Sequence, residues 1–203
     1  KGLFENNGFQ IKTDVTLGDI EIDIIAKKNN QVFIFECKNS YHPVNDFELR
    51  NVYAHIDKAS KQLEKIKVKI SDPQNRKNLS KKIGFSLYQV DINYAIINSN
   101  RIFYGYLNKG YRCISSHFLS NILQRGFITV NNKKYNLRRS ANFHEFDLID
   151  VINGKFISDY EKLAHEDFQV YEIGFSKIKI QRFGYSPEQI FEHIANNYPM
   201  IDL

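Results

Sequence analysis

The sequence predicts a mixed α/β fold of the α+β kind, in which a central sheet is flanked by helices. Three observations support this prediction. Two strand-like stretches between Gly18 and Lys38 are joined by a short polar turn. A long amphipathic stretch with a helix-capping residue follows them. Further strand-like stretches between residues 89 and 107, and a short helix over residues 115–123, complete the same unit.

Composition places the chain among globular proteins, with 42% hydrophobic and 25% charged residues. No apolar run approaches the length of about 20 residues that a membrane helix needs, and no signal-peptide pattern is present. Two cysteines make no disulfide framework, so we interpret both as buried thiols and expect a reducing, cytoplasmic setting. Because the chain begins at Lys1 without methionine, we expect it to be part of a longer protein.

Charge is distributed unevenly along the chain. Residues 1–125 carry 19 Lys and Arg against 12 Asp and Glu, whereas residues 126–203 carry 9 against 11. The overall net charge of +5 modestly favours a polyanionic partner, and the basic excess belongs to the part that contains the hairpin. Lysine-rich surfaces also aid solubility, so charge alone leaves both interpretations open.

The first eight residues predict a short helix closed by Gly8, and residues 9–16 predict the first strand. Residues 19–24 then alternate strictly between acid and isoleucine, which is typical of a strand with one polar face. Residues 31–36 are β-branched and aromatic and predict its partner. Asn29 and Asn30 lie between the two stretches, and asparagine tolerates the positive φ angles of a hairpin turn.

This turn fixes a register in which Lys28 faces Gln31, so that Asp23 faces Glu36 and Glu21 faces Lys38. Opposed carboxylates destabilise neighbouring strands, which indicates a cation between them, and hard carboxylate oxygens suit Mg²⁺ or Mn²⁺. The alternative is a solvent-facing strand in which Lys38 forms a surface ion pair. The same register assigns one apolar face to Ile20, Ile22, Ile24, Phe33, Phe35 and Cys37.

The stretches IDIIA and FIFECK resemble the core of the PD-(D/E)XK nuclease superfamily. Asp23, Glu36, Lys38 and Asn39 match its pattern, while Ile22 stands where the pattern has proline. The resemblance covers about residues 3–125 and implies a restriction-endonuclease-like mixed central sheet flanked by helices. We therefore expect residues 1–125 to form a nuclease-like core and residues 126–203 a C-terminal α+β extension of unknown role.

A helix is predicted from Asn45 to about Lys69, because Asn45 and Glu48 have the form of a capping box. Many members of the superfamily carry a glutamine on this helix, often with a lysine four residues earlier. Gln62 and Lys58 match that pattern, and the resemblance implies that they bind substrate phosphate or a metal-bound water. Plain helix surface is the alternative interpretation.

The rest of the chain gives further expectations. Residues 69–82 predict a mobile loop or a short helix, which either tracks a nucleic-acid backbone or is simply solvated. The expected strands span 89–97, 101–107 and 146–152, the hairpins 127–137 and 168–183, and the helices 115–123, 156–165 and from 186 onward.

The resemblance implies a Mg²⁺- or Mn²⁺-dependent endonuclease that hydrolyses phosphodiester bonds, with DNA favoured over RNA, in restriction, defence or repair. Asp23, Glu36 and the backbone carbonyl of Cys37 would hold the metal, Lys38 would orient the attacking water, and Gln62 would assist. Substrate contacts are assigned to Lys58, Gln62 and Asn39, and Glu5 and Glu21 are secondary candidates for the site.

Two alternatives remain open at this point. In the first, the chain is a nucleic-acid-binding or assembly module on the same fold, with cleavage absent or gated by a partner. In the second, it is a ribonuclease. Nothing in the sequence separates DNA from RNA, because the recognising loops cannot be placed from sequence. A homodimer or a larger-protein context is compatible with each interpretation, and no membrane partner is expected.

Overall fold

The computed structural model describes residues 1–130, 133–155, 168–171 and 180–183. Six strands form one mixed sheet in the order β1-β2-β3-β4-β6-β5, which confirms the predicted mixed α/β class. The first three strands pair antiparallel, β3-β4 and β4-β6 pair parallel, and β5 pairs antiparallel with β6. The strands are β1 Gln10–Leu17, β2 Ile20–Lys28, β3 Gln31–Lys38, β4 Asp91–Asn98, β5 Leu107–Asn108 and β6 Tyr111–Ser115.

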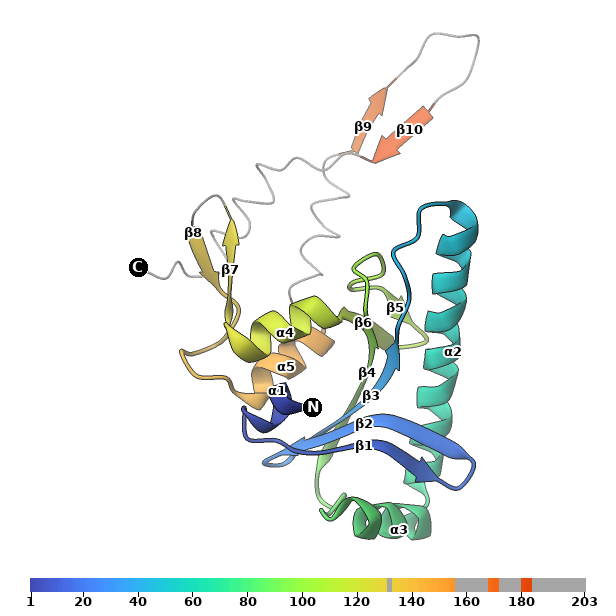
Figure 1. The fold of residues 1–203 in the computed structure, drawn as a ribbon, viewed down its shortest axis with the longest axis vertical. Helices are drawn as coiled ribbons and strands as arrows, with labels where there is room; N and C mark the ends of the chain where they lie inside the picture. Colours follow the sequence, from blue (N-terminus) through green and yellow to red (C-terminus); the bar gives the residue numbers. More distant parts are fainter. Residues whose placement is uncertain (131–132, 156–167, 172–179, 184–203) are drawn as a thin grey trace.

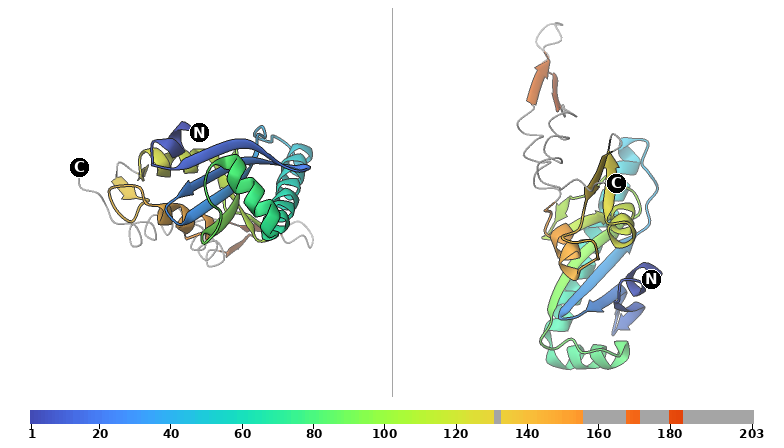
Figure 2. Two further views of the ribbon diagram at one scale, coloured as in Figure 1. Left: turned by 90° about the horizontal axis from the view of Figure 1, so that it is seen from below. Right: turned by 90° about the vertical axis from the view of Figure 1, so that its left-hand side faces the viewer.

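Helices cover both faces of the sheet (Figures 1 and 2). One face carries α2 Asp46–Ser71, and α3 Pro73–Ile83 continues from its end. The other face carries α1 Gly2–Glu5, α4 Ser116–Gln124 and α5 Glu145–Ile152. Among the described residues, no helix combines the length and the apolar character needed to cross a membrane.

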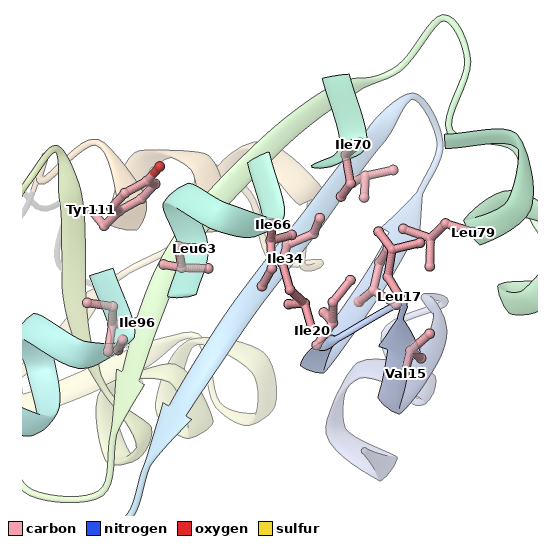
Figure 3. Close-up of a cluster of buried hydrophobic side chains, with 14 of the residues drawn as sticks. Val15, Leu17, Ile20, Ile34, Leu63, Ile66, Ile70, Leu79, Ile96 and Tyr111 are labelled. Atoms are coloured by element: carbon pink, nitrogen blue, oxygen red, sulfur yellow. The ribbon is translucent and has the colours of Figure 1, made fainter. Parts of the chain in front are cut away.

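Two buried clusters result, one on each side of the sheet. Figure 3 shows the cluster beneath α2, where Ile34 of β3 packs with Leu63 and Ile66 of the helix. The opposite cluster contains Phe33 and Phe35. Residues 31–36 of β3 are therefore buried without interruption, as expected for a strand covered on both faces.

Part of the segment after residue 125 belongs to this core. Leu148 and Val151 of α5 are buried in the same cluster as Phe33 and Phe35, and Leu137 and Phe143 join them. The arrangement arises because α5 places these two side chains three residues apart, on one helix face, against β4 and β6.

The beginning of α2 confirms the predicted capping. Asn45 Oδ1 accepts a hydrogen bond from the Glu48 amide at 2.9 Å, and Glu48 Oε2 accepts one from the Val44 amide at 2.9 Å. The helix ends at Ser71, two residues beyond the predicted end. Asp72 then caps α3, so the short-helix interpretation of residues 69–82 is the correct one.

Two predicted strands are wrong. Residues 101–105 form turns, only Leu107 of the predicted strand lies in β5, and the strand that pairs with β4 is β6. Residues 146–152 are helical because His144 and Asp147 form a reciprocal capping box, which starts α5 at Glu145. The hairpins β7–β8 (Phe127–Val130, Lys133–Asn136) and β9–β10 (Phe168–Tyr171, Ile180–Phe183) are confirmed. The helices predicted at 156–165 and from 186 lie outside the described residues.

Strands β1 and β2 change faces halfway along. Ile22 packs in the cluster beneath α2, whereas Ile24 packs in the opposite cluster with Phe33, Phe35 and Cys37. The predicted single apolar face containing Ile20, Ile22 and Ile24 is therefore wrong. In β1 the change lies between Ile11, in the cluster of Phe33, and Val15, in the cluster beneath α2, and Asp14 between them has a left-handed φ of 53°.

Candidate active site

The β2–β3 hairpin has the predicted register over its paired length. Lys28 pairs with Gln31 at the turn and Ile24 pairs with Phe35 at the open end. Asn29 adopts a φ of 51°, which asparagine tolerates better than most residues. Asp23 and Glu36 are the next residues beyond the last backbone pair, so they occupy facing positions where the backbone ladder ends.

Asp23 replaces the backbone as the partner of β3 at this point. Its Oδ2 accepts a hydrogen bond from the Cys37 amide at 2.6 Å. The amide and carbonyl of a strand residue point to the same side, so the Cys37 carbonyl also faces β2 and Asp23. The backbone oxygen assigned to the metal by the sequence resemblance is therefore directed toward the facing carboxylates.

Glu36 is fully buried yet only partly bonded. Its Oε2 accepts a hydrogen bond from Lys38 Nζ at 3.2 Å, while Oε1 is buried and has no hydrogen-bond partner among the described residues. Burial and the neighbouring charge of Asp23 raise the pKa of the Glu36 carboxyl and Lys38 lowers it, so that the pKa lies at about 7. A buried carboxylate oxygen without a donor is costly, and a cation at this position would satisfy it.

Lys38 connects the strand to the helix. Strand alternation places Glu36 and Lys38 on the α2 face of β3, and Lys38 Nζ donates a hydrogen bond to Gln62 Oε1 at 2.9 Å. Gln62 is held at this position because Leu63, the next residue of α2, is anchored in the core. Three elements, β2, β3 and α2, thus bring together Asp23, Glu36, Lys38 and Gln62.

The donor set fits a hard divalent cation. Asp23 and Glu36 present facing carboxylates, Glu36 Oε1 lacks a donor, and the Cys37 carbonyl is directed toward them. Within the described ranges no three His, Cys, Asp or Glu side chains gather as a metal site. Two carboxylates with one carbonyl and water are the oxygen ligands that Mg²⁺ accepts, since it usually keeps several waters.

The remaining predicted residues lie at different distances from this centre. Lys58 is exposed on α2 one helical turn before Gln62, and Asn39 is exposed directly after Lys38. Glu21 is exposed and pairs with Thr16 of β1, although its charge also raises the Glu36 pKa. Glu5 forms an ion pair with Lys1 at 3.7 Å.

Glu5 is not brought to the centre. It lines a depression with Phe9 and Gln10, at the beginning of β1. Gln10 pairs with Lys27, which lies next to the hairpin turn and four residues from Asp23 along β2. The structure therefore places Glu5 toward the turn end of the hairpin, whereas the carboxylate pair lies toward its open end.

Sequence reasoning missed a polar group beside Lys38. Ser40 is buried, and its Oγ lies 3.2 Å from Nδ1 of His55 on α2. Asn98, the neighbour of Lys38 on β4, is also buried, and its Oδ1 accepts no hydrogen bond from the part of the chain that the structure describes. His55 lies seven residues before Gln62, which puts both on one face of the helix. This spacing is the feature of the sequence that could have indicated His55 as a neighbour of the site.

This arrangement places two facing carboxylates beside an ammonium group whose orientation is fixed by two oxygens. Such a combination binds and polarises a phosphate ester together with a water molecule. Comparison of the chain with protein-family models, with curated protein sequences and with solved structures found no match. Function is therefore inferred from the residues and their geometry.

Proposed function

We propose that the chain is a metal-dependent nuclease of the PD-(D/E)XK type, with a restriction-endonuclease-like fold, which hydrolyses phosphodiester bonds. One observation carries the proposal: Lys38 Nζ contacts both Glu36 and Gln62, while Asp23 faces Glu36 at the end of the hairpin. The mixed sheet supports it, because the hairpin leads into a long helix and then into two parallel strands.

Each residue has a defined role in this mechanism. Asp23, Glu36 and the Cys37 carbonyl hold Mg²⁺ or Mn²⁺, which when bound neutralises phosphate charge and lowers the pKa of water. Lys38 orients the attacking water and stabilises the charge that develops on the phosphate. Gln62 Oε1 accepts a hydrogen bond from the Lys38 ammonium group and so keeps the side chain directed toward the carboxylates.

The substrate proposed is nucleic acid, with DNA favoured over RNA. Residues 1–125 hold the basic excess of the chain, and this part contains the candidate centre. Restriction or anti-phage defence is the proposed setting, followed by repair. Lys58 and Asn39 are exposed close to Gln62 and Lys38 along the chain, where each is available to the phosphate backbone.

Cleavage assays with single alanine variants test the proposal. Plasmid and oligonucleotide substrates are incubated with Mg²⁺ or Mn²⁺, and the rate is compared between the wild type, Lys38→Ala and Asp23→Ala. Each change should reduce the rate by at least about 100-fold, since each removes a charge used in the transition state. Lys12→Ala, an exposed lysine on β1, serves as the control and should keep the wild-type rate.

Metal binding gives a readout that does not require cleavage. Titration calorimetry with Mn²⁺ should show a site in the wild type that Asp23→Ala loses and Lys12→Ala keeps. Cleavage that survives Lys38→Ala at the wild-type rate would contradict the mechanism. A wild type that binds nucleic acid tightly but cuts neither DNA nor RNA with any divalent metal would instead identify a binding or assembly module.

A further inference from the structure

Exposed apolar side chains concentrate in two segments of the chain, one of which follows Lys38 after two residues. Of the eleven large hydrophobic residues exposed among the described residues, eight lie in the segments 41–53 and 102–107. The most exposed are Tyr41 at 96%, Val44 at 82% and Phe47 at 72%. Single exposed apolar residues are ordinary, but a group of this size on one part of a surface marks an interaction site.

The two segments are held against each other by hydrogen bonds and ring contacts. Asn100 Nδ2 donates to the carbonyls of Ser40 at 3.3 Å and Tyr41 at 3.1 Å, which ties the loop after β4 to the loop after β3. The Tyr53 ring on α2 lies 6.1 Å from the Tyr106 ring. The backbone of Tyr41 is therefore fixed while its ring faces solvent. We call Tyr41, Phe47, Tyr53 and Tyr106 the aromatic surface.

This surface begins beside the proposed catalytic lysine. Tyr41 follows Lys38 by three residues, which is at most about 11 Å of extended chain. Between them, Ser40 contacts His55 on the helix that also carries Gln62. A polymer whose phosphate reaches Lys38 therefore passes within reach of Tyr41.

Cations without acidic partners accompany these rings. Arg50, Lys58 and Arg101 are exposed, and none forms an ion pair within the described ranges. Lys61 and Lys109 differ, because Asp57 pairs with both at 2.6 Å and 3.2 Å. In a two-fold dimer the same surface of both copies would be in contact, so these unpaired cations would lie close to the identical cations of the second copy. A polyanion with flat apolar groups is the better match.

We propose that the aromatic surface stacks on unpaired nucleobases, so that the chain acts on nucleic acid that is single-stranded or locally unpaired beside the scissile phosphate. This inference rests on the proposed function and specifies its substrate class. Aromatic rings stack on bases only where the base faces are accessible, and a duplex conceals them. Stacking also tolerates any base sequence, because every base has a flat face.

Binding without divalent metal tests this inference. Fluorescence anisotropy in EDTA compares a labelled single strand, a blunt duplex and a duplex with a single-stranded tail. Tyr41→Ala and Phe47→Ala should weaken binding of the single strand and the tailed duplex by about 5- to 150-fold each, and leave the blunt duplex unchanged. Tyr41→Phe should retain binding because the ring remains. Tyr88→Ala, at 45% exposure and remote from this surface in sequence, should also retain it.

Three results would overturn the inference. They are unchanged single-strand affinity in both alanine variants, an equal loss of duplex affinity, and an oligomer that Tyr41→Ala dissociates in sedimentation. Failure of the nuclease proposal looks different. A chain that binds single strands through Tyr41 but cuts nothing with any metal refutes only the nuclease function. If the wild type cuts nucleic acid but Tyr41→Ala binds single strands as tightly as the wild type, only the stacking inference is refuted.

Discussion

Lys38 on β3 donates a hydrogen bond to Gln62 on α2 across 2.9 Å, so the central sheet and its longest helix meet at a charged group. The side chain of Lys38 is only 17% exposed. An ammonium group placed there needs oxygen acceptors, and Glu36 and Gln62 supply them. The packing of α2 on the sheet therefore determines the direction of the lysine.

Removing Gln62 should impair catalysis more than binding. Gln62→Ala leaves Lys38 with one acceptor, and the resulting misorientation should lower kcat by about 10- to 100-fold with little change in KM. Gln62→Glu keeps an acceptor oxygen and should retain more activity. Steady-state kinetics check this, with Gln74→Ala on α3 as the matched control. Equal kcat for Gln62→Ala and the wild type would contradict the positioning role.

Glu36 should make stability depend on pH in the metal-free protein. Its pKa of about 7 lies above the ordinary value of 4.5, so between these values the folded state binds more protons than the unfolded state. Stability therefore falls as pH rises from 4.5 to 7, by up to about 3 kcal/mol from this group. Glu36→Gln should be more stable than the wild type at pH 8, and the difference should vanish near pH 4.

Urea unfolding at the two pH values in EDTA measures this difference, with Glu5→Gln as the control for an exposed acid away from the carboxylate pair. Addition of Mn²⁺ at pH 8 should stabilise the wild type and have a smaller effect on Glu36→Gln, since the ligand is lost. A variant that is less stable than the wild type at pH 8 would show that Glu36 is not destabilising there.

The core should extend beyond residue 125. Leu148→Ala removes a fully buried side chain that packs in one cluster with Phe33 and Phe35, and should cost about 2–5 kcal/mol of unfolding free energy. Val68→Ala, which truncates a side chain 61% exposed on α2, should change it by less than about 0.5 kcal/mol. Thermal unfolding of the whole chain checks both. Equal effects of the two changes would contradict the packing of α5 on the sheet.

The cap of α2 should contribute measurably to stability. Asn45→Ala removes the acceptor of the Glu48 amide, which should cost about 1 kcal/mol, whereas Asn45→Gly should cost only about a few tenths. Chemical denaturation separates the two values. The same helix carries Gln62, but the cap lies seventeen positions away, so kcat should be unaffected by either change.

The hairpin was predictable because its determinants are local. Alternation from Asp19 to Ile24 and the Asn29 turn are both short-range signals, and together they bring Asp23 opposite Glu36. The change of faces at Asp14 was not predictable, because both faces of the sheet are buried and the isoleucines suit either one. Ser40 and His55 were missed for another reason: only the packing of α2 on β3 brings them together.

The bond between Asp23 Oδ2 and the Cys37 amide affects the choice of an inactive variant. Asp23→Ala removes a proposed metal ligand and also releases the amide that closes the open end of the hairpin. The Cys37 amide proton should then exchange with solvent faster. A complex of substrate with this variant would therefore show a strand end that is altered from the wild type. Lys38→Met removes the ammonium charge while this bond remains, and is therefore the better variant for capturing an uncut complex.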